Sequence, residues 1–565
     1  MNFVPLSLSK SDRNLLLVQI VFPVSLLILG IYHGFIQVLY RAGIIQSQSF
    51  LGLDYYQGLT LHGVINAIVF TTFFAVGFGN ALILYYLRSG LCRTTAWVGN
   101  IMMLVGTLLA AAIILAGKAN ILYTFYPPLK GHPLFYIGAV LLVIGSWVSF
   151  FNWIPPYLKW RRENPGKKTP MAILGIFASF IVWFIATLPL AFEVLVLLLP
   201  WSLGWTDEVN VTLARTLFWF FGHPLVYFWL LPAYTMYYAM LPKIAGGKLY
   251  SDFAGRLAFM LFILLSCPIG LHHQYSDPGI QSSWKWFHGI LTFCVALPSF
   301  ITAFTLAASM EIGARSRGGK GLFAWWAKLP HWNSKGDQWL FPYLFLGLIL
   351  FLFGGITGII NASAAMNGLI HNTSWVPAHF HTTLGGPVFL AFIAMSLWMV
   401  VKILGKPVRY PRLNLSVPYL WILGVVFFST GMSVTGLMGE PRRTNMGMTF
   451  TNPESPLFHE GWKFISHFVV IGGTIMFLSM IAYFIVFFGT LFSSKTEDDR
   501  LDFPNAEPFH DENISWVQNF KPWLVATALV LAVAYTIPLL EVYKGTKKGA
   551  PAYSPDNPIP LRDQK

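Results

Sequence analysis

Long apolar stretches alternate with short polar segments along almost the whole chain. Each stretch has about 20 residues or more, the length that an α-helix needs to cross about 30 Å of hydrocarbon. With no internal repeat and no second domain visible, we expect one all-α, polytopic membrane domain over residues 1–565. The pattern predicts thirteen transmembrane helices, near residues 15–40, 59–87, 96–117, 134–158, 171–199, 211–241, 255–275, 286–312, 340–362, 373–403, 416–438, 462–492 and 521–542.

The composition fits a chain that lies mostly in lipid. Of its 565 residues, 55% are hydrophobic and 11% are charged, whereas a soluble domain carries roughly 25% charged residues. The first apolar stretch is longer than a signal-peptide core of about 7–15 residues, so we interpret it as a retained helix. Cys92, Cys267 and Cys294 have no paired spacing, and they predict neither a disulfide framework nor a thiolate metal site.

The distribution of basic residues predicts the orientation of the bundle. With the N-terminus in the cytoplasm, most Lys and Arg residues fall in inner loops, such as 159–168 and 315–335, as the positive-inside rule requires. Thirteen crossings then place the C-terminus and its polar tail, 543–565, outside. The net charge of +14 therefore reflects topology, and it does not indicate a nucleic-acid partner. We expect a multi-pass protein of the cytoplasmic membrane.

Six histidines lie inside the predicted helices, where burial of a titratable ring is costly and usually functional. In the predicted topology all six fall at a similar depth, in the outer half of the bilayer. Independent packing histidines would have no reason to share a level, so the pattern predicts bound metal ions. The six are His62, His223, His272, His273, His379 and His381.

His379 and His381 lie two residues apart on one predicted helix. At 3.6 residues per turn their side chains point roughly 200° apart, so each can hold a separate heme with the helix as a wall between them. His62 can supply the second axial ligand to one of these irons. Iron with two histidines carries electrons, whereas iron with one histidine keeps a face open for a gas ligand.

The remaining three histidines, His223, His272 and His273, suit one copper ion, which favours nitrogen ligands. The adjacent pair can reach one metal only if the helix end is distorted. Pro268 and Gly270 just before the pair make such a distortion plausible.

Polar stripes run from this region toward the predicted inner side. Tyr227 lies four residues after His223 and shares its helix face, where a phenol could donate a proton and an electron to bound dioxygen. Such stripes predict a proton path, although hydroxyls often bond to their own helix and tyrosines often only pack. The further members are Tyr234 and Tyr238 on the same helix, Ser299, Thr302 and Thr305 on another, and Ser251 near the inner mouth.

Several segments resemble subunit I of the heme–copper oxygen reductases. They are FFGHPLVYF (220–228), LHHQYSDPG (271–279), WVPAHFH (375–381) and YYQGLTLHGVINAIVFT (55–71). Further segments are similar to the B-family, the cytochrome ba-type oxidases: LYTFYPPLKGH (122–132), PKIAGGKL (242–249) and PRR (441–443). The resemblance runs through the twelfth predicted helix and is weaker in the last one.

The resemblance implies a function and a set of cofactors. His62 and His381 would bind a low-spin heme of b-type, His379 a high-spin heme of a-type, and the other three histidines one copper ion. Tyr227 would be cross-linked to His223. The chain would reduce dioxygen to water with electrons from cytochrome c, received through a subunit II with a dicopper site, and would translocate protons across the lipid bilayer.

The family pattern also assigns residues at the outer side and shows two departures. Arg442, Arg443 and His371 would pair with heme propionates through charge-assisted hydrogen bonds, and Asp277 could pair with the arginines. The B-family has an aspartate where this chain has Asn367, so no proton-loading role is expected there. Leu225 replaces the glutamate of the A-family, so the second, glutamate-dependent channel of that family is not expected.

Three other interpretations stay open. A nitric oxide reductase of the same superfamily uses a non-heme iron with a glutamate ligand and lacks the tyrosine, so Tyr227 argues against it. A quinol oxidase is harder to exclude, because no dicopper site is encoded here. A proton-coupled transporter is the alternative from a different class, and two hemes in the visible spectrum would exclude it.

Overall fold

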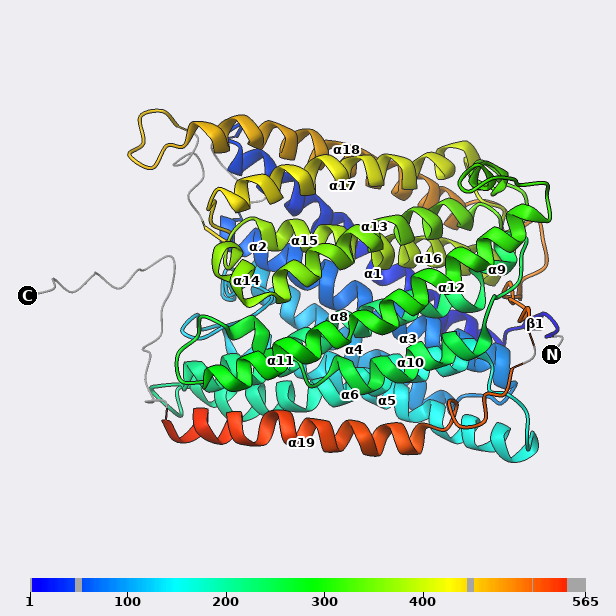
Figure 1. Cartoon of the computed structure of the whole chain (residues 1–565), viewed down its shortest axis with the longest axis horizontal. Helices are drawn as coiled ribbons and strands as arrows, with labels where there is room; N and C mark the ends of the chain where they lie inside the picture. Colours follow the sequence, from blue (N-terminus) through cyan, green and yellow to red (C-terminus); the bar gives the residue numbers. More distant parts are fainter. Residues whose placement is uncertain (1–2, 46–52, 445–451, 511, 546–565) are drawn as a thin grey trace, which may run out of the picture.

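The computed structural model describes residues 3–45, 53–444, 452–510 and 512–545. Long helices lie side by side in one bundle, as Figure 1 shows. The first half of the chain forms α1 (Lys10–Arg41), α2 (Tyr55–Gly63), η1 (Val64–Val69), α3 (Phe70–Leu82), η2 (Ile83–Leu87), α4 (Arg93–Leu115), α5 (Pro133–Glu163), α6 (Met171–Phe192), η3 (Glu193–Leu198), α7 (Leu199–Ser202), α8 (Val211–Ala239), α9 (Leu241–Ile244), α10 (Asp252–Ser266) and η4 (Gly270–Gln274). The second half forms α11 (Ser282–Cys294), α12 (Ala296–Arg315), η5 (Ala324–Lys328), α13 (Leu340–Ala362), α14 (Ala364–Ile370), α15 (Trp375–Thr383), η6 (Leu384–Val388), α16 (Phe389–Leu404), α17 (Pro411–Leu437), α18 (Glu460–Leu491) and α19 (Phe520–Gly545).

Twelve helical stretches within the described residues are long and apolar enough to cross a membrane. Some of them pass through a π-helical turn, such as Tyr55–Leu87 (α2 to η2) and Trp375–Leu404 (α15 to α16). These twelve match twelve of the thirteen predicted segments, which confirms the prediction of an all-α, polytopic membrane protein.

The predicted segment 255–275 differs from the other twelve. Its helix, α10, has 15 residues, which cover only about 22 Å at 1.5 Å per residue. After Ser266 the chain leaves the α-helix, and a short 3₁₀-helix, η4, completes the crossing. One crossing is therefore a short helix with an irregular end.

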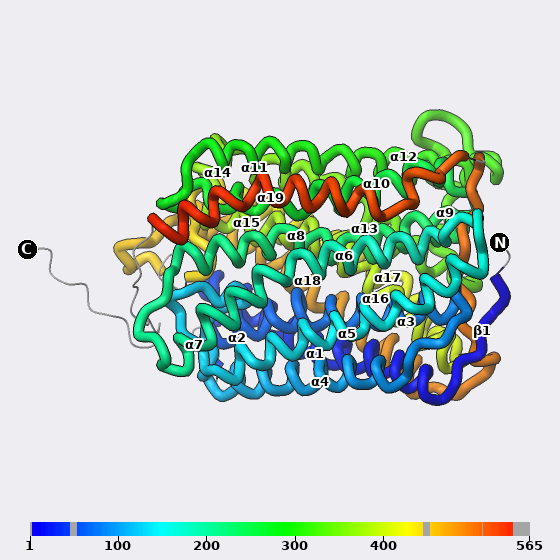
Figure 2. The backbone as a smooth tube through the Cα atoms, turned by 90° about the horizontal axis from the view of Figure 1, so that it is seen from below, coloured from blue at the N-terminus to red at the C-terminus, as the bar shows by residue number. Residues whose placement is uncertain are grey.

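The centre of the bundle is formed by α3, α8 and α16, which are buried along almost their whole length. Peripheral helices α4, α12 and α19 expose large apolar side chains, among them Leu108, Phe304 and Leu529, which is the pattern of a lipid-facing surface. Figure 2 shows α19 running along the outside of the bundle. Of the metal-binding candidates, His223 lies on one of these central helices, α8.

The two ends of the described chain lie at opposite ends of the bundle. β1 (Leu6–Ser7) is at one end, and α19 finishes at the other (Figure 1). An odd number of crossings produces this arrangement; which end faces the cytoplasm stays a prediction. Residues 546–565 of the predicted outer tail are outside the described part of the chain.

The segment after α18 closes the end of the bundle where the chain begins. Its strand β2 (Arg500–Leu501) pairs antiparallel with β1. The side chain of Phe503 is buried against Trp398, with ring centroids 4.6 Å apart. The backbone N–H of Ala506 donates to the carbonyl of Ala239, at the end of α8, over 2.7 Å. This segment therefore packs against α8 and α16 at the end of the bundle where the chain begins.

Candidate metal centre

Three histidines from two separate elements meet inside the bundle. His223 comes from α8, and His272 and His273 come from η4. One ring nitrogen of each lies within 4.8 Å of the other two, and Nδ1 of His223 is 2.9 Å from Nε2 of His273. Three converging imidazole nitrogens suit copper, so the cluster fits the ion that the sequence predicts.

The break after α10 lets two neighbouring histidines reach one point. α10 ends at Ser266, two residues before Pro268, which has no backbone N–H to donate to a helical carbonyl and so favours a break. The chain then turns tightly through Gly270–Gln274, and the rings of His272 and His273 have centroids 4.2 Å apart. In a regular helix, consecutive side chains would point about 100° apart.

Neighbouring side chains orient both rings of this pair. Nδ1 of His272 lies 2.5 Å from the carbonyl oxygen of Ile269 and 2.9 Å from the hydroxyl of Thr292. Since Nδ1–H donates to the carbonyl, Nε2 remains for a metal, and such outer hydrogen bonds are typical of metal-binding histidines. Trp219 stacks on His273, with centroids 3.9 Å apart and planes 12° apart.

Tyr227 lies at the edge of the three-histidine cluster. Its hydroxyl is 3.1 Å from Nε2 of His223, as their four-residue spacing on α8 predicts. Because Nε2 is engaged there, His223 presents Nδ1 to the other two histidines. Both residues line a cavity of about 450 Å³.

His379, on α15, lines the same cavity as the three-histidine cluster. Its Nδ1 lies 2.8 Å from the hydroxyl of Thr357, which itself donates to the carbonyl of Gly354. Thr357 therefore accepts the Nδ1 proton, and Nε2 of His379 is left for a metal. A side chain at Gly355 would meet open space, and a Cβ at Gly358 would approach the His379 ring to 3.3 Å. This face of α13 has room for a flat group.

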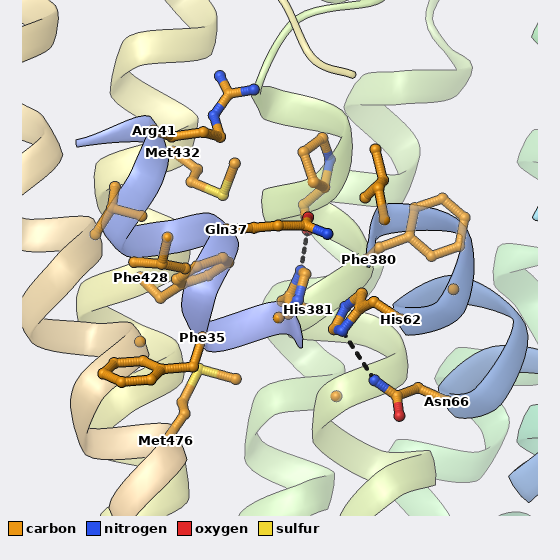
Figure 3. A pocket seen from close by; sticks show the side chains of 18 of the residues that line it. Phe35, Gln37, Arg41, His62, Asn66, Phe380, His381, Phe428, Met432 and Met476 are labelled. Atoms are coloured by element: carbon orange, nitrogen blue, oxygen red, sulfur yellow. Dashed lines mark hydrogen bonds between the residues drawn. The ribbon is translucent and has the colours of Figure 1, made fainter. Parts of the chain in front are cut away.

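A second cavity, of about 300 Å³, holds the other two histidines. Figure 3 shows His62 and His381 side by side in it. Their ring centroids are 6.3 Å apart, and their ring planes lie at 16° to each other. Metal–imidazole bonds of about 2 Å on each side account for this separation, so one iron fits between the rings. Their Nδ1 atoms contact the carbonyl oxygens of Gly30 and Pro377, at 2.8 and 2.7 Å, which leaves both Nε2 atoms for the metal.

His379 and His381 thus line different cavities, although they are two residues apart on α15. The helical periodicity predicts this separation, and the structure places the two side chains accordingly. Phe380 lies between them in sequence and lines both cavities. One helix therefore forms the wall between the two sites.

A cationic group closes one end of both cavities. Arg442 and Arg443 line the two of them, and His371 lines the larger one. The Nε of Arg442 is buried with no hydrogen-bond partner among the described residues, and its Nη2 donates to Asn372 over 3.2 Å. Burial and the adjacent Arg443 lower the pKa of Arg442 to about 9. An anionic group here would pair with this charge, which is the environment that heme propionates require.

The loop with these arginines is held by an ion pair that the sequence pattern did not reveal. Arg41, at the end of α1, pairs with Glu440 at 2.8 Å and donates to the carbonyl of Pro441 at 3.0 Å. The partners are 399 positions apart, so no local pattern could have found them. Arg41 also lines the cavity of His62.

Asp277 does not pair with Arg442 or Arg443, which corrects the expectation from the sequence. Its Oδ1 pairs instead with Nη2 of Arg215 at 3.0 Å. Gln274 donates to the other carboxylate oxygen, also at 3.0 Å. Arg215 lies on α8, which packs against η4. This packing brings the guanidinium of Arg215 closer to the Asp277 carboxylate than those of Arg442 and Arg443 are.

The predicted polar stripes lie on neighbouring faces of α8 and α12. Tyr238 donates to Thr302 over 2.8 Å, and Tyr234 lies beside Ser299. The hydroxyl of Tyr234 has no hydrogen-bond partner within the described part of the chain. Ser299 and Tyr227 both line the larger cavity, so the stripes begin at its wall.

Two further polar residues extend the stripes and were not predicted. Ser309 donates to the carbonyl of Thr305 over 2.6 Å and accepts from the backbone N–H of Tyr250 at 2.9 Å. The next residue, Ser251, has its hydroxyl 2.7 Å from a carboxylate oxygen of Glu512. Ser309 was recognisable as the next member of the α12 stripe, whereas the contact with Glu512 spans 261 positions.

A membrane helix bundle with these features belongs to a defined class. One cavity has two facing histidines, a second has His379 and the three-histidine cluster as candidate metal ligands, and one helix separates them. Such sites suit an electron-carrying iron beside a reactive iron–copper pair. The class is an intramembrane metalloenzyme for redox chemistry.

Comparison with known proteins identifies the family. The sequence profile of the family described as cytochrome c and quinol oxidase polypeptide I matches residues 14–475. Cytochrome c oxidase subunit 1 of Thermus thermophilus is 40% identical over 501 residues, which are 87% of each chain. The heme–copper oxidase subunit I+III of Aeropyrum pernix is 26% identical over 512 residues, and the chain spans 57% of that protein.

A solved structure agrees with this result. It is a cryo-EM structure of a heme–copper terminal oxidase dimer, 49% identical, with a TM-score of 0.96 over 98% of this chain and 97% of that one. The chain therefore belongs to the cytochrome c and quinol oxidase polypeptide I family, and it is the catalytic subunit of a heme–copper terminal oxidase. The two cavities and the histidine cluster fit the hemes and copper of that class.

Proposed function

We propose that this chain reduces dioxygen to water at the wall formed by α15, with electrons from cytochrome c, and couples the reaction to proton translocation. The observation that carries the proposal is the separation of the two histidine sites by one helix. His62 and His381 would hold the low-spin heme of b-type, and His379 the high-spin heme of a-type. His223, His272 and His273 would hold one copper ion.

Each of these residues has a defined task in the proposed reaction. When bound, the hemes and the copper ion supply the electron transfer and the binding and reduction of dioxygen. The histidines would orient these groups, because five of them have their other ring nitrogen engaged by a backbone carbonyl or a hydroxyl. The ring of the sixth, His273, is held by stacking on Trp219. Arg442, Arg443 and His371 would neutralise the propionates at the outer edge, where the half-buried Arg442 has a buried Nε without a hydrogen-bond partner among the described residues.

Tyr227 is proposed as the catalytic proton donor. Its hydroxyl lies against the ring of His223 and lines the larger cavity, so it reaches a substrate held there. A positioned acid of this kind commonly accelerates proton transfer by roughly 10²–10⁴-fold. The same proximity makes a covalent bond between the two rings sterically accessible.

Protons would reach Tyr227 along the facing stripes of α8 and α12. The path would run from Ser251 and Glu512 past Thr305 to Thr302 and Tyr238, and from there past Tyr234 and Ser299 to the cavity. The hydroxyl of Tyr234 has no hydrogen-bond partner among the residues that the structure describes, and one water molecule beside it would bridge to Ser299.

Electrons are proposed to enter from a partner subunit. Cys92, Cys267 and Cys294 are unpaired, so they form no dicopper site. The name of the Thermus thermophilus relative, cytochrome c oxidase subunit 1, indicates cytochrome c as the electron donor of that protein. In the present chain's complex, a subunit II with a dicopper site would bind at the outer side and pass on electrons from cytochrome c. The complex would lie in the cytoplasmic membrane.

The decisive experiment is a reduced-minus-oxidised spectrum of the purified complex with and without carbon monoxide. We expect two hemes, of which one binds carbon monoxide, and one copper per two hemes in the isolated catalytic subunit. Oxygen consumption with reduced cytochrome c should exceed that with a quinol. The opposite donor preference would favour a quinol oxidase, and a third iron in place of copper would favour a nitric oxide reductase.

A further inference from the structure

The helix break that brings His272 and His273 together leaves backbone groups without helical partners. After α10 ends, the N–H groups of Gly270 and Leu271 lie in the buried interior. A buried N–H without an acceptor is costly, so native structures nearly always provide one. The acceptors here come from side chains on two other helices, α11 and α19.

Tyr535, on α19, accepts the first of these N–H groups. Its hydroxyl lies 3.0 Å from the N–H of Gly270 and donates to the carbonyl of Cys267 over 3.4 Å. Gly270 is held tightly between two elements, since an added Cβ would lie 2.3 Å from the carbonyl oxygen of Trp219 and 2.7 Å from the Tyr535 hydroxyl. Tyr535 therefore fixes the start of η4 against α8.

The ring of Tyr535 also contacts the helix that carries the third ligand. It stacks on Phe220 of α8, with centroids 3.6 Å apart and planes 2° apart. Phe220 lies three residues before His223, on the same helix. Tyr535 of α19 therefore contacts both elements that carry the three-histidine cluster, η4 and α8.

His288, on α11, accepts the second N–H group. Its Nδ1 accepts from Leu271 over 3.3 Å, and its Nε2 donates to the carbonyl of Ala534 on α19 over 2.9 Å. Thr292, four residues later on the same face, places its hydroxyl 2.9 Å from Nδ1 of His272. α11 thus holds both the backbone of η4 and the ring of one ligand, and it is itself tied to α19.

We propose that Tyr535 and His288 are positioning residues for the copper site, and that α19 supports the copper ligands through them. The proposal rests on the proposed copper ligation by His223, His272 and His273. The contacts explain why a helix on the outside of the bundle packs against the end of α10, where the irregular turn begins. Residues that support metal ligands in this way typically change metal affinity by roughly 10- to 100-fold.

The test uses the purified full complex with Tyr535→Phe and, separately, His288→Gln. Tyr535→Phe keeps the ring on Phe220 and removes only the hydroxyl. Copper is titrated out of the reduced protein with a competing Cu(I) chelator, and the infrared band of carbon monoxide on copper is recorded after photolysis. Tyr543→Phe is the matched control, because Tyr543 lies on the same helix and is 68% exposed.

We expect both variants to lose copper at roughly 10- to 100-fold lower chelator concentration than the wild type, with a shifted or broadened infrared band. The low-spin heme spectrum and the Tyr543→Phe control should match the wild type. Wild-type copper retention and an unchanged band in both variants would overturn the proposal. Loss of both hemes together with copper in both variants would also overturn it, because α19 would then support the whole bundle. A wild-type complex without copper would refute the proposed copper site itself.

Discussion

At the scale of single residues, five of the six candidate metal-binding histidines are oriented by a contact to the ring nitrogen that does not face the metal site, and the sixth, His273, is oriented by stacking on Trp219. The Nδ1 atoms of His62, His272 and His381 contact backbone carbonyls, and Nδ1 of His379 contacts a threonine hydroxyl. His223 is reversed, because Tyr227 takes its Nε2. Such a contact fixes which ring nitrogen carries the proton before any metal binds. The folded chain therefore presents the metal-binding nitrogens in a defined arrangement.

The heme site of His62 and His381 and the copper site should therefore lose their metals independently when one ligand is removed. His381→Ala should abolish the low-spin heme signal and leave copper in place, because α15 separates that heme from the copper cluster. His272→Ala should release copper and keep the low-spin heme. Visible spectra and metal analysis of the purified complex measure both outcomes. His467→Ala, at an exposed position on α18, is the control, and loss of all metals from both variants would contradict separate sites.

The ion pair of Arg41 and Glu440 gives a prediction for pH. Burial alone would raise the pKa of Glu440, but the adjacent Arg41 outweighs it and holds the pKa below its usual value. A carboxylate with a lowered pKa stabilises the folded state above its unfolded pKa, near 4.3, and this contribution is lost as the pH falls through the folded pKa. Glu440→Gln should therefore lower the free energy of unfolding by about 2 kcal/mol at neutral pH, which is the scale of a hydrogen bond to a charged group.

The measurement is the rate of heme loss on heating, recorded from neutral pH down to about pH 3, which lies below the unfolded pKa near 4.3. The difference between wild type and Glu440→Gln should shrink toward the acid end. Glu454→Gln, an exposed residue on the same side of the bundle, should behave as the wild type throughout. A difference that stays constant over the whole range would show that the ion pair is not its cause.

At the scale of elements, the stripes on α8 and α12 should act as one path. Thr302→Val removes the hydroxyl that accepts from Tyr238 and keeps the shape of the side chain. Oxygen consumption should fall by roughly 10²-fold, the lower end for a positioned proton-transfer group, while the carbon monoxide difference spectrum stays unchanged. Thr107→Val, at a buried position on α4, should have no such effect. Unchanged turnover in Thr302→Val would exclude this hydroxyl from the path.

Local periodicity was sufficient to predict most of the helices and the relative placement of some candidate site residues. The 3.6-residue repeat separated His379 from His381 and placed Tyr227 beside His223, since both relations lie within one or two turns. The repeat could not reveal Tyr535 or Glu512, because their partners lie 265 and 261 positions away. It also overestimated the length of α10, since apolar residues continue through the irregular turn that follows.

At the scale of the whole molecule, the bundle has two chemically different ends. The loops at the end where the chain begins carry most of the basic residues, whereas Arg442, Arg443 and His371 lie at the other end, beside the cavities. Under the proposed function, protons for water formation would enter from the end where the chain begins, and electrons would enter from the opposite end. Each turnover would then move charge across the membrane even before any additional proton is translocated.

The orientation can be tested with a cysteine that the chain already has. Cys92 is exposed in the short loop before α4, on the predicted inner side, and hydrogen bonds from Thr95 lower the pKa of its thiol, which favours the reactive thiolate. A membrane-impermeant maleimide should therefore label Cys92 in inverted vesicles and not in intact spheroplasts. Cys92→Ser identifies the labelled site, because Cys294, also exposed, lies within a membrane-spanning helix. Labelling of Cys92 from the outside of spheroplasts would show that the predicted orientation is wrong. The proposed proton path would then open to the outer side of the membrane and could not take up protons from the cytoplasm.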